Sequence, residues 1–239
     1  MSGEQAVLRK PLFGSRLNMS HPLSRGLVGC WLLNETGGVQ AMDLSPYGNH
    51  GLLAGFDSPP KRAFNGLAFD GIDDYIDCGN DESLDITDEI TIELWVYISN
   101  QTENYGRILM KEPLNENVQF FINQLAGGFT GEVVFRDYDG STTKAITIAG
   151  LSQDRWTHLV TTYDSVTVKV YADAVEKGSL NYVANRTAGD DLIIGGNKDT
   201  SNFKGLINGV RIWNRALSAQ DIKNLYLSPH APMGEPMYL

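Results

Sequence analysis

The chain has 239 residues, of which 42% are hydrophobic and 20% charged, a composition typical of a globular domain. Its net charge is −10, which argues against general nucleic-acid binding because affinity for a duplex depends on neutralising phosphates with Lys and Arg. It contains no apolar run long enough to span a bilayer, so membrane insertion is not expected.

The first 26 residues are interrupted by Pro and Gly and lack hydrophobic periodicity, which predicts an extended N-terminal arm over residues 1–26. Four basic residues and no acidic ones lie between Gln5 and Asn34, namely Arg9, Lys10, Arg16 and Arg25. Two interpretations stay open: a solvated tail, or an assembly arm that docks on an acidic surface of its own or a neighbouring subunit.

The arm has no continuous apolar segment of the kind found in a signal peptide, so we expect the protein to be made in the cytoplasm. We therefore expect Cys30 and Cys78 to be buried thiols, with a disulfide as the alternative.

After the arm the pattern is that of β-strands. Residues 91–99 alternate strictly between an aliphatic face and a mixed polar and aromatic face, which is the period of a sandwich strand. Gly209 lies inside the last long strand and indicates a bulge or a close approach of another part of the chain. We predict strands at residues 27–34, 91–99, 132–136, 143–148, 156–163, 166–171, 192–195 and 206–213.

One short helix follows the last strand. Ser218 is a predicted N-cap with Asp221 three residues later, a variant of the capping box, and Pro229 limits the helix. Residues 228–239 contain three prolines and are predicted to be an irregular tail, which leaves residues 27–227 as the folded domain.

Several segments, in order, resemble the laminin G-like, concanavalin A-like jelly-roll family. They are GLVGCWLLNE at 26–35, DLSPYGNHGLL at 43–53, LAFDGIDDYID at 67–77 and GLINGVRIWNRALSAQDIKNLY at 205–226. The resemblance covers residues 26–227. It implies an all-β fold, a two-sheet antiparallel jelly-roll β-sandwich with one short C-terminal helix.

The resemblance also implies a calcium ion near the loop after the first strand, close to the last long strand. Calcium prefers oxygen ligands, and the matching positions are Asp43, Asn49, the backbone of His50, and Asn208. Local turn capping by Asp43 and Asn49 is the alternative. A second acidic cluster, Asp70, Asp73 and Asp74, has the same two interpretations: a metal site, or turn residues in a glycine-rich bend.

Carbohydrate binding is a further function of such jelly rolls, and it requires an aromatic platform. Candidates are Trp95, Tyr97, Tyr105, Tyr138 and Trp213; for Trp95 and Trp213 the alternative is a role as packed core aromatics.

Catalysis is not expected. The Glu-x-Asp-x-x-Glu run of jelly-roll glucanases is absent, because Glu89 and Glu93 lack a central Asp between them. We expect His158, in a strand beside Trp156, to be a packed structural histidine.

The segment from His21 to Trp31 looks like laminin G-like proteins encoded near phage structural genes. The first hypothesis is therefore a non-catalytic structural or adhesion module at a virion surface (capsid decoration or tail-associated), assembled as a homo-oligomer or with other particle proteins. The rival is a lectin-like module that binds a glycan.

Overall fold

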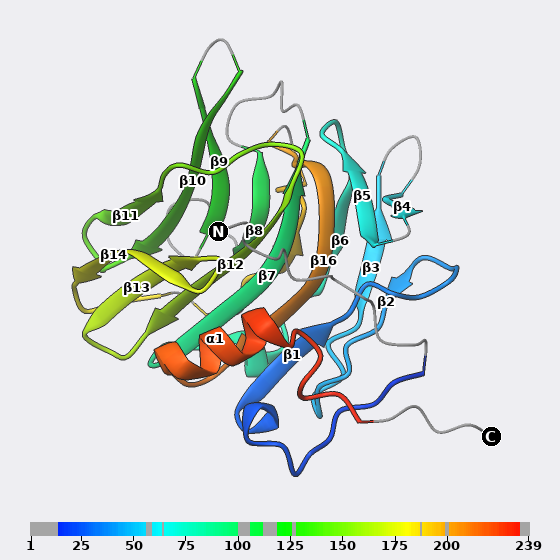
Figure 1. Cartoon of the computed structure of the whole chain (residues 1–239), viewed down its shortest axis with the longest axis horizontal. Coiled ribbons are helices and arrows are strands. Elements are labelled where there is room, and N and C mark those ends of the chain that lie inside the picture. The colour runs from blue at the N-terminus through cyan, green and yellow to red at the C-terminus, as the bar shows by residue number, and fades with distance from the viewer. Residues whose placement is uncertain are drawn as a thin grey trace, which may run out of the picture.

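The computed structural model describes residues 14–55, 59–63, 65–99, 106–111, 119–125, 128–186, 188–198 and 201–234. These residues form two eight-stranded sheets stacked face to face (Figure 1). All strand pairings named below are antiparallel, which confirms the predicted all-β sandwich.

The first sheet has the strand order β14-β13-β12-β7-β16-β5-β4, and β1 also pairs with β16. Its strands are β1 (Leu27–Trp31), β4 (Lys61–Ala63), β5 (Gly66–Asp70), β7 (Ile90–Ile98), β12 (Trp156–Tyr163), β13 (Thr167–Ala172), β14 (Val175–Asn181) and β16 (Lys204–Trp213).

The second sheet has the order β11-β10-β9-β8-β15-β6-β3-β2. Its strands are β2 (Gln40–Ala41), β3 (Gly51–Ala54), β6 (Tyr75–Asp77), β8 (Arg107–Lys111), β9 (Gln119–Leu125), β10 (Gly128–Tyr138), β11 (Thr143–Ile148) and β15 (Leu192–Ile194). Short 3-10 turns lie at Pro22–Ser24 and Glu82–Leu84, and helix α1 spans Ala219–Leu227.

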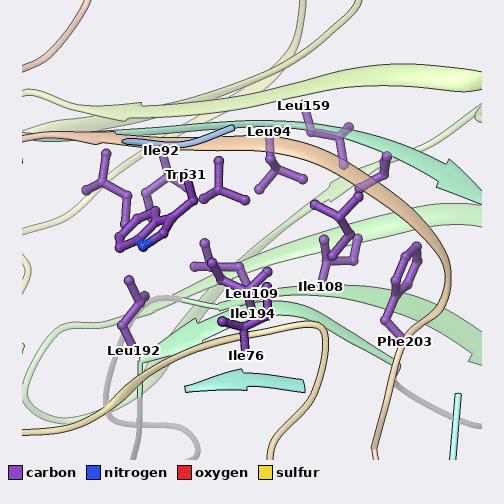
Figure 2. Packing of buried hydrophobic residues seen from close by; sticks show 14 of the residues in the cluster. Trp31, Ile76, Ile92, Leu94, Ile108, Leu109, Leu159, Leu192, Ile194 and Phe203 are labelled. Carbon is purple, nitrogen blue, oxygen red and sulfur yellow. The ribbon is translucent and has the colours of Figure 1, made fainter. Parts of the chain in front are cut away.

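The main core lies between the two sheets (Figure 2). Every second residue of β7 from Ile90 to Ile98 belongs to it, as the alternation predicts. Trp31 of β1 packs into the same core and donates its indole N–H to the carbonyl of Asn49 at 2.8 Å. The core therefore holds one end of the 43–50 loop.

Strand β1 ends at Trp31, earlier than the predicted residue 34, and Leu33 has a left-handed backbone (φ 53°). A branched side chain in this region is uncommon and marks a turn. Gly209 behaves as predicted: the register of β16 against β7 shifts between Asn208 and Val210, and Gly209 has φ 67°.

A second apolar cluster, the outer cluster, covers the other face of the first sheet. It consists of Leu23, Leu27, Cys30, Leu32, Val160, Tyr171, Trp213, Leu217, Ile222 and Leu225. Helix α1 begins with the predicted capping box, in which the Ser218 and Asp221 side chains each bond the other's backbone N–H. The helix lies across this sheet face (Figure 1), so both faces of β7 and β16 are covered.

The described parts of the N-terminal arm and the C-terminal tail run side by side (Figure 1). The Asn18 N–H donates to the Pro232 carbonyl at 2.9 Å, and the Gly234 N–H donates to the Arg16 carbonyl at 2.7 Å. The Trp213 indole donates to the Leu23 carbonyl at 2.7 Å. Residues 14–26 are therefore packed against the domain and form part of its surface.

Within the part of the chain that the structure describes, none of the helices has the length and hydrophobicity of a membrane span.

Candidate functional site

The loop after β1 is organised by one carboxylate, Asp43. Its Oδ1 accepts hydrogen bonds from the backbone N–H groups of Cys30 (2.7 Å) and Ser45 (2.8 Å). Its Oδ2 accepts from the Ser45 hydroxyl (2.5 Å) and the Asn49 N–H (2.8 Å). The side chain is buried. Four donors therefore saturate the two oxygens, each of which has two lone pairs.

The other predicted calcium ligands also make hydrogen bonds in and around this loop. The His50 Nδ1 accepts from the Asp43 N–H at 3.0 Å, and the Asn49 amide donates to the Val28 carbonyl and the Ser83 hydroxyl. Asn208 donates to the Asn65 carbonyl at 3.0 Å. A cation needs free oxygen lone pairs, and four donors already occupy those of Asp43, which favours the turn-capping alternative for this residue. A calcium ion at Asp43, Asn49, the His50 backbone and Asn208 stays a prediction.

Two of the aromatic residues predicted to bind a sugar, Trp95 and Trp213, are buried, so this prediction is wrong for them. Trp95 is 3% exposed and stacks on Tyr226 of α1, with ring centroids 5.7 Å apart. Trp213 is 0% exposed within the outer cluster. A buried ring cannot stack on a sugar. Tyr97 is half-buried and contacts Trp156 edge-on, and Tyr105 lies outside the described residues.

Glu93 lies beneath α1 in a buried ion cluster. It accepts hydrogen bonds from Arg211 through Oε2 (2.7 Å) and Oε1 (3.0 Å), and its Oε1 lies 2.9 Å from His158 Nε2. Burial acts to raise the pKa of Glu93, but the neighbouring Arg211 and His158 hold this pKa below its ordinary value. His158 is fully buried, as expected of a packed structural histidine.

The basic residues predicted for the arm divide into two pairs. Arg9 and Lys10 lie outside the described residues. Arg16 and Arg25 lie in the described part, where their backbone carbonyls accept bonds from Gly234 and from the Arg215 guanidinium.

One surface depression is lined by side chains from several separate segments of the chain. Its volume is about 630 Å³, and its lining is Val28, Tyr47, Glu82, Ser83, Asp85, Ile86, Thr87, Asp88, Glu89, Ser165 and Asn214. Four of these side chains are carboxylates and none is basic. Sequence reasoning missed this site because its members come from β1 and from four other segments that are distant in the chain.

The floor of the depression is held by two buried cations that lie behind it. Arg186 pairs with Asp137 and donates through Nη1 to the carbonyls of Ile86, Thr87 and Asp88. Lys111 Nζ lies 2.6 Å from Asp85 Oδ1. The 85–88 segment is therefore fixed before any ligand arrives, which lowers the entropic cost of binding.

Tyr47 is the aromatic residue of this depression. It lies between Pro46 and Gly48, and 53% of it is exposed. The Asn49 amide joins its loop to Ser83 at 2.9 Å. An exposed ring beside carboxylate and hydroxyl acceptors is suited to a ligand with an apolar face and several O–H donors.

The fold is an antiparallel β-sandwich of two stacked sheets. Residues 70–223 match the family described as the concanavalin A-like lectin/glucanases superfamily, represented by its laminin G-like members. The chain belongs to this superfamily. No curated protein sequence matches it.

Several solved structures share the fold. The receptor-binding domain of botulinum neurotoxin mosaic serotype C/D has a TM-score of 0.69 and 15% identity, over 85% of this chain and 51% of that one. Trypanosoma rangeli sialidase in complex with sialic acid has a TM-score of 0.67 and 18% identity, over 86% and 33%. The chain thus spans about half the length of the neurotoxin domain and about a third of the length of the sialidase.

Domain 4 of AbnA, a GH43 extracellular arabinanase from Geobacillus stearothermophilus solved with arabinotriose, has a TM-score of 0.63 and 20% identity. The alignment covers 84% of this chain and 98% of that domain. At these identities the likeness shows the fold alone.

Proposed function

We propose that the protein is a non-catalytic recognition module that binds a neutral oligosaccharide in the depression around Tyr47. The observation that carries the proposal is the exposed Tyr47 ring beside four carboxylates on a pre-fixed floor. Carboxylates accept strong hydrogen bonds from sugar hydroxyls, and an aromatic ring packs on the C–H face of a sugar.

The charge of the depression selects the kind of glycan. Glu82, Asp88 and Glu89 are exposed, and no lining residue is basic. Anionic sugars would meet like charge, which costs affinity. The preferred ligand is therefore uncharged, in the manner of the arabinotriose bound to the AbnA domain rather than the sialic acid bound to the sialidase.

The non-catalytic part of the proposal is supported by the place of Glu93. This carboxylate, on β7, is 0% exposed and bonded to Arg211. A substrate has no access to it. We expect no release of reducing sugar from any oligosaccharide that the protein binds.

The test is binding of neutral and sialylated oligosaccharides by glycan array and then calorimetry. Tyr47→Ala should weaken binding at least about tenfold, equivalent to about 1.4 kcal/mol. Tyr138→Ala, which changes a half-buried tyrosine outside the depression, should leave it unchanged. A preference for sialylated glycans, or equal binding by the Tyr47 variant, would refute the proposal.

We also propose a place in a larger assembly, such as a virion surface, through contact with a second copy of the chain. Support comes from a mostly apolar hollow of about 380 Å³ lined by Arg16, Leu17, Met19, Leu44 and Pro46. Met19 is 60% exposed. Apolar surface of this kind is suited to a protein interface.

Light scattering of the full chain and of a version lacking residues 1–13 tests this assembly role. The cut ends before Ser15 because Leu17 and Leu23 pack in the outer cluster, and a longer deletion would open that cluster. A defined oligomer that Met19→Asp dissociates supports the role. A monomeric full chain contradicts self-assembly.

A further inference from the structure

Three aspartates converge at the turn that joins β5 of the first sheet to β6 of the second. One carboxylate oxygen from each of Asp70, Asp73 and Asp74 lies within 4.8 Å of the other two. Across the residues that the structure describes, no other group of three His, Cys, Asp or Glu side chains meets this criterion. Like charges at such distances repel unless a cation or protons neutralise them.

The turn fixes these carboxylates through its own backbone. Asp70 Oδ1 accepts from the Ile72 N–H at 2.8 Å, and Asp74 Oδ2 accepts from the Asp70 N–H at 2.9 Å. Gly71 has φ 82°, and a Cβ there would lie 2.8 Å from the Cβ of Lys204. The conformation therefore depends on glycine, and it points the carboxylates toward one another.

The second oxygen of Asp74 points independently to a ligand. Asp74 is 3% exposed, and its Oδ1 is buried without a hydrogen-bond partner. A buried carboxylate oxygen with no donor is costly. A metal ion beside Oδ1 would supply the missing partner.

We propose that Asp70, Asp73 and Asp74 bind one calcium ion, with Asp74 Oδ1 as a buried ligand. The donor set is oxygen only, which suits a hard cation and disfavours zinc or copper. Calcium tolerates irregular geometry, whereas magnesium requires a near-ideal octahedron and keeps most of its waters. Water molecules complete the six to eight ligands.

The bound ion would join the two layers of the fold. Asp70 ends β5 and pairs with Lys204 of β16, and Asp74 directly precedes β6. The Asn202 amide donates to the Ile72 carbonyl at the tip of the same turn. The site is therefore a structural staple, separate from the Asp43 loop and from the depression around Tyr47.

The experiment is thermal unfolding of the full chain in EDTA and in increasing calcium, with calorimetry to count bound ions. At a calcium concentration 100 times the dissociation constant, the melting temperature should rise by about 5 to 10 °C. Asp74→Asn, which keeps the shape and removes the charge, should abolish this rise. Magnesium at the same concentration should give a smaller rise.

Two further variants complete the test. Asp73→Asn should weaken calcium binding, and because Asp73 is less buried than Asp74, this variant serves if the Asp74 variant fails to fold. Asp43→Asn should lower the starting melting temperature and keep the calcium-dependent rise. The proposal is overturned if the wild type shows no saturable rise up to 10 mM calcium, or if the rise survives in both Asp74→Asn and Asp73→Asn.

Discussion

The ion pair between Glu93 and Arg211 makes a sharp prediction about stability. Glu93 is 0% and Arg211 3% exposed, and two hydrogen bonds join them. Arg211→Met removes the cation and leaves a buried carboxylate with His158 as its remaining side-chain partner. Breaking a buried pair in this way costs about 3–5 kcal/mol. For a domain of this size the melting temperature should fall by about 6–20 °C, at roughly 2–4 °C per kcal/mol.

The assay is urea unfolding followed by tryptophan fluorescence, since Trp95 and Trp213 lie beside the pair. The double variant Glu93→Gln with Arg211→Met should be more stable than Arg211→Met alone, because it no longer buries an unpaired charge. A loss below about 1 kcal/mol for Arg211→Met would refute the reasoning. Simple additivity in the double variant would refute it as well.

The same pair sets a response to acid. Because the folded-state pKa of Glu93 lies below its ordinary value of 4.5, the unfolded chain binds the proton more readily than the folded one. The stabilisation is therefore present above pH 4.5 and is lost as the pH falls through the folded-state pKa. Glu93→Gln should reduce the loss of stability below pH 4.5.

Three other predictions concern single side chains. Asp43→Ala leaves buried N–H donors of Cys30, Ser45 and Asn49 without an acceptor, and should lower the free energy of unfolding by at least about 3 kcal/mol in urea; full stability would contradict its role in the loop. Burial raises the pKa of the Cys30 thiol to about 12 and that of Cys78 well above 9.0, so neither should react with a disulfide reagent until the protein unfolds; rapid modification of the native protein would contradict this. In calcium-free buffer, the pKa of Asp74 at about 6 means that stability is lost as pH rises through that value, and Asp74→Asn should melt higher than wild type at pH 7.5; an unchanged pH profile in the variant would show that Asp74 is not the group responsible.

Sequence patterns predicted the structure correctly where it depends only on residues close together in the chain. Alternation in residues 90–98 placed the inner face of β7, because a strand has no other period. The Ser218 capping box and the Gly209 bulge depend on backbone groups within three residues of each other. These features follow from the chain itself and need no knowledge of distant partners.

Contacts between distant parts of the chain could not be predicted in the same way, because they depend on how strands and loops are brought together in the fold. Arg211 meets Glu93 only because β16 pairs with β7 in a register that opposes these two residues. Asp43 and Asn49 have the residue types of both a calcium loop and a capped turn. The donors that surround Asp43, one of them 13 residues away in β1, favour the capped turn, and the sequence alone does not place them there.

The aromatic residues show why the loops, and not the sheet face, carry the candidate binding surface. Strand alternation places Trp95 on the face of β7 that points away from the inner core. That outer face is not exposed, because α1 and residues 14–26 cover it. Both faces of the strand are therefore buried. Tyr47 stands between Pro46 and Gly48 in a loop tied to Asp43 and Ser83, and 53% of it is exposed. An aromatic ring exposed on a segment that is itself held rigid has no packing role that explains its position, and ligand recognition is the role that such a ring is suited to.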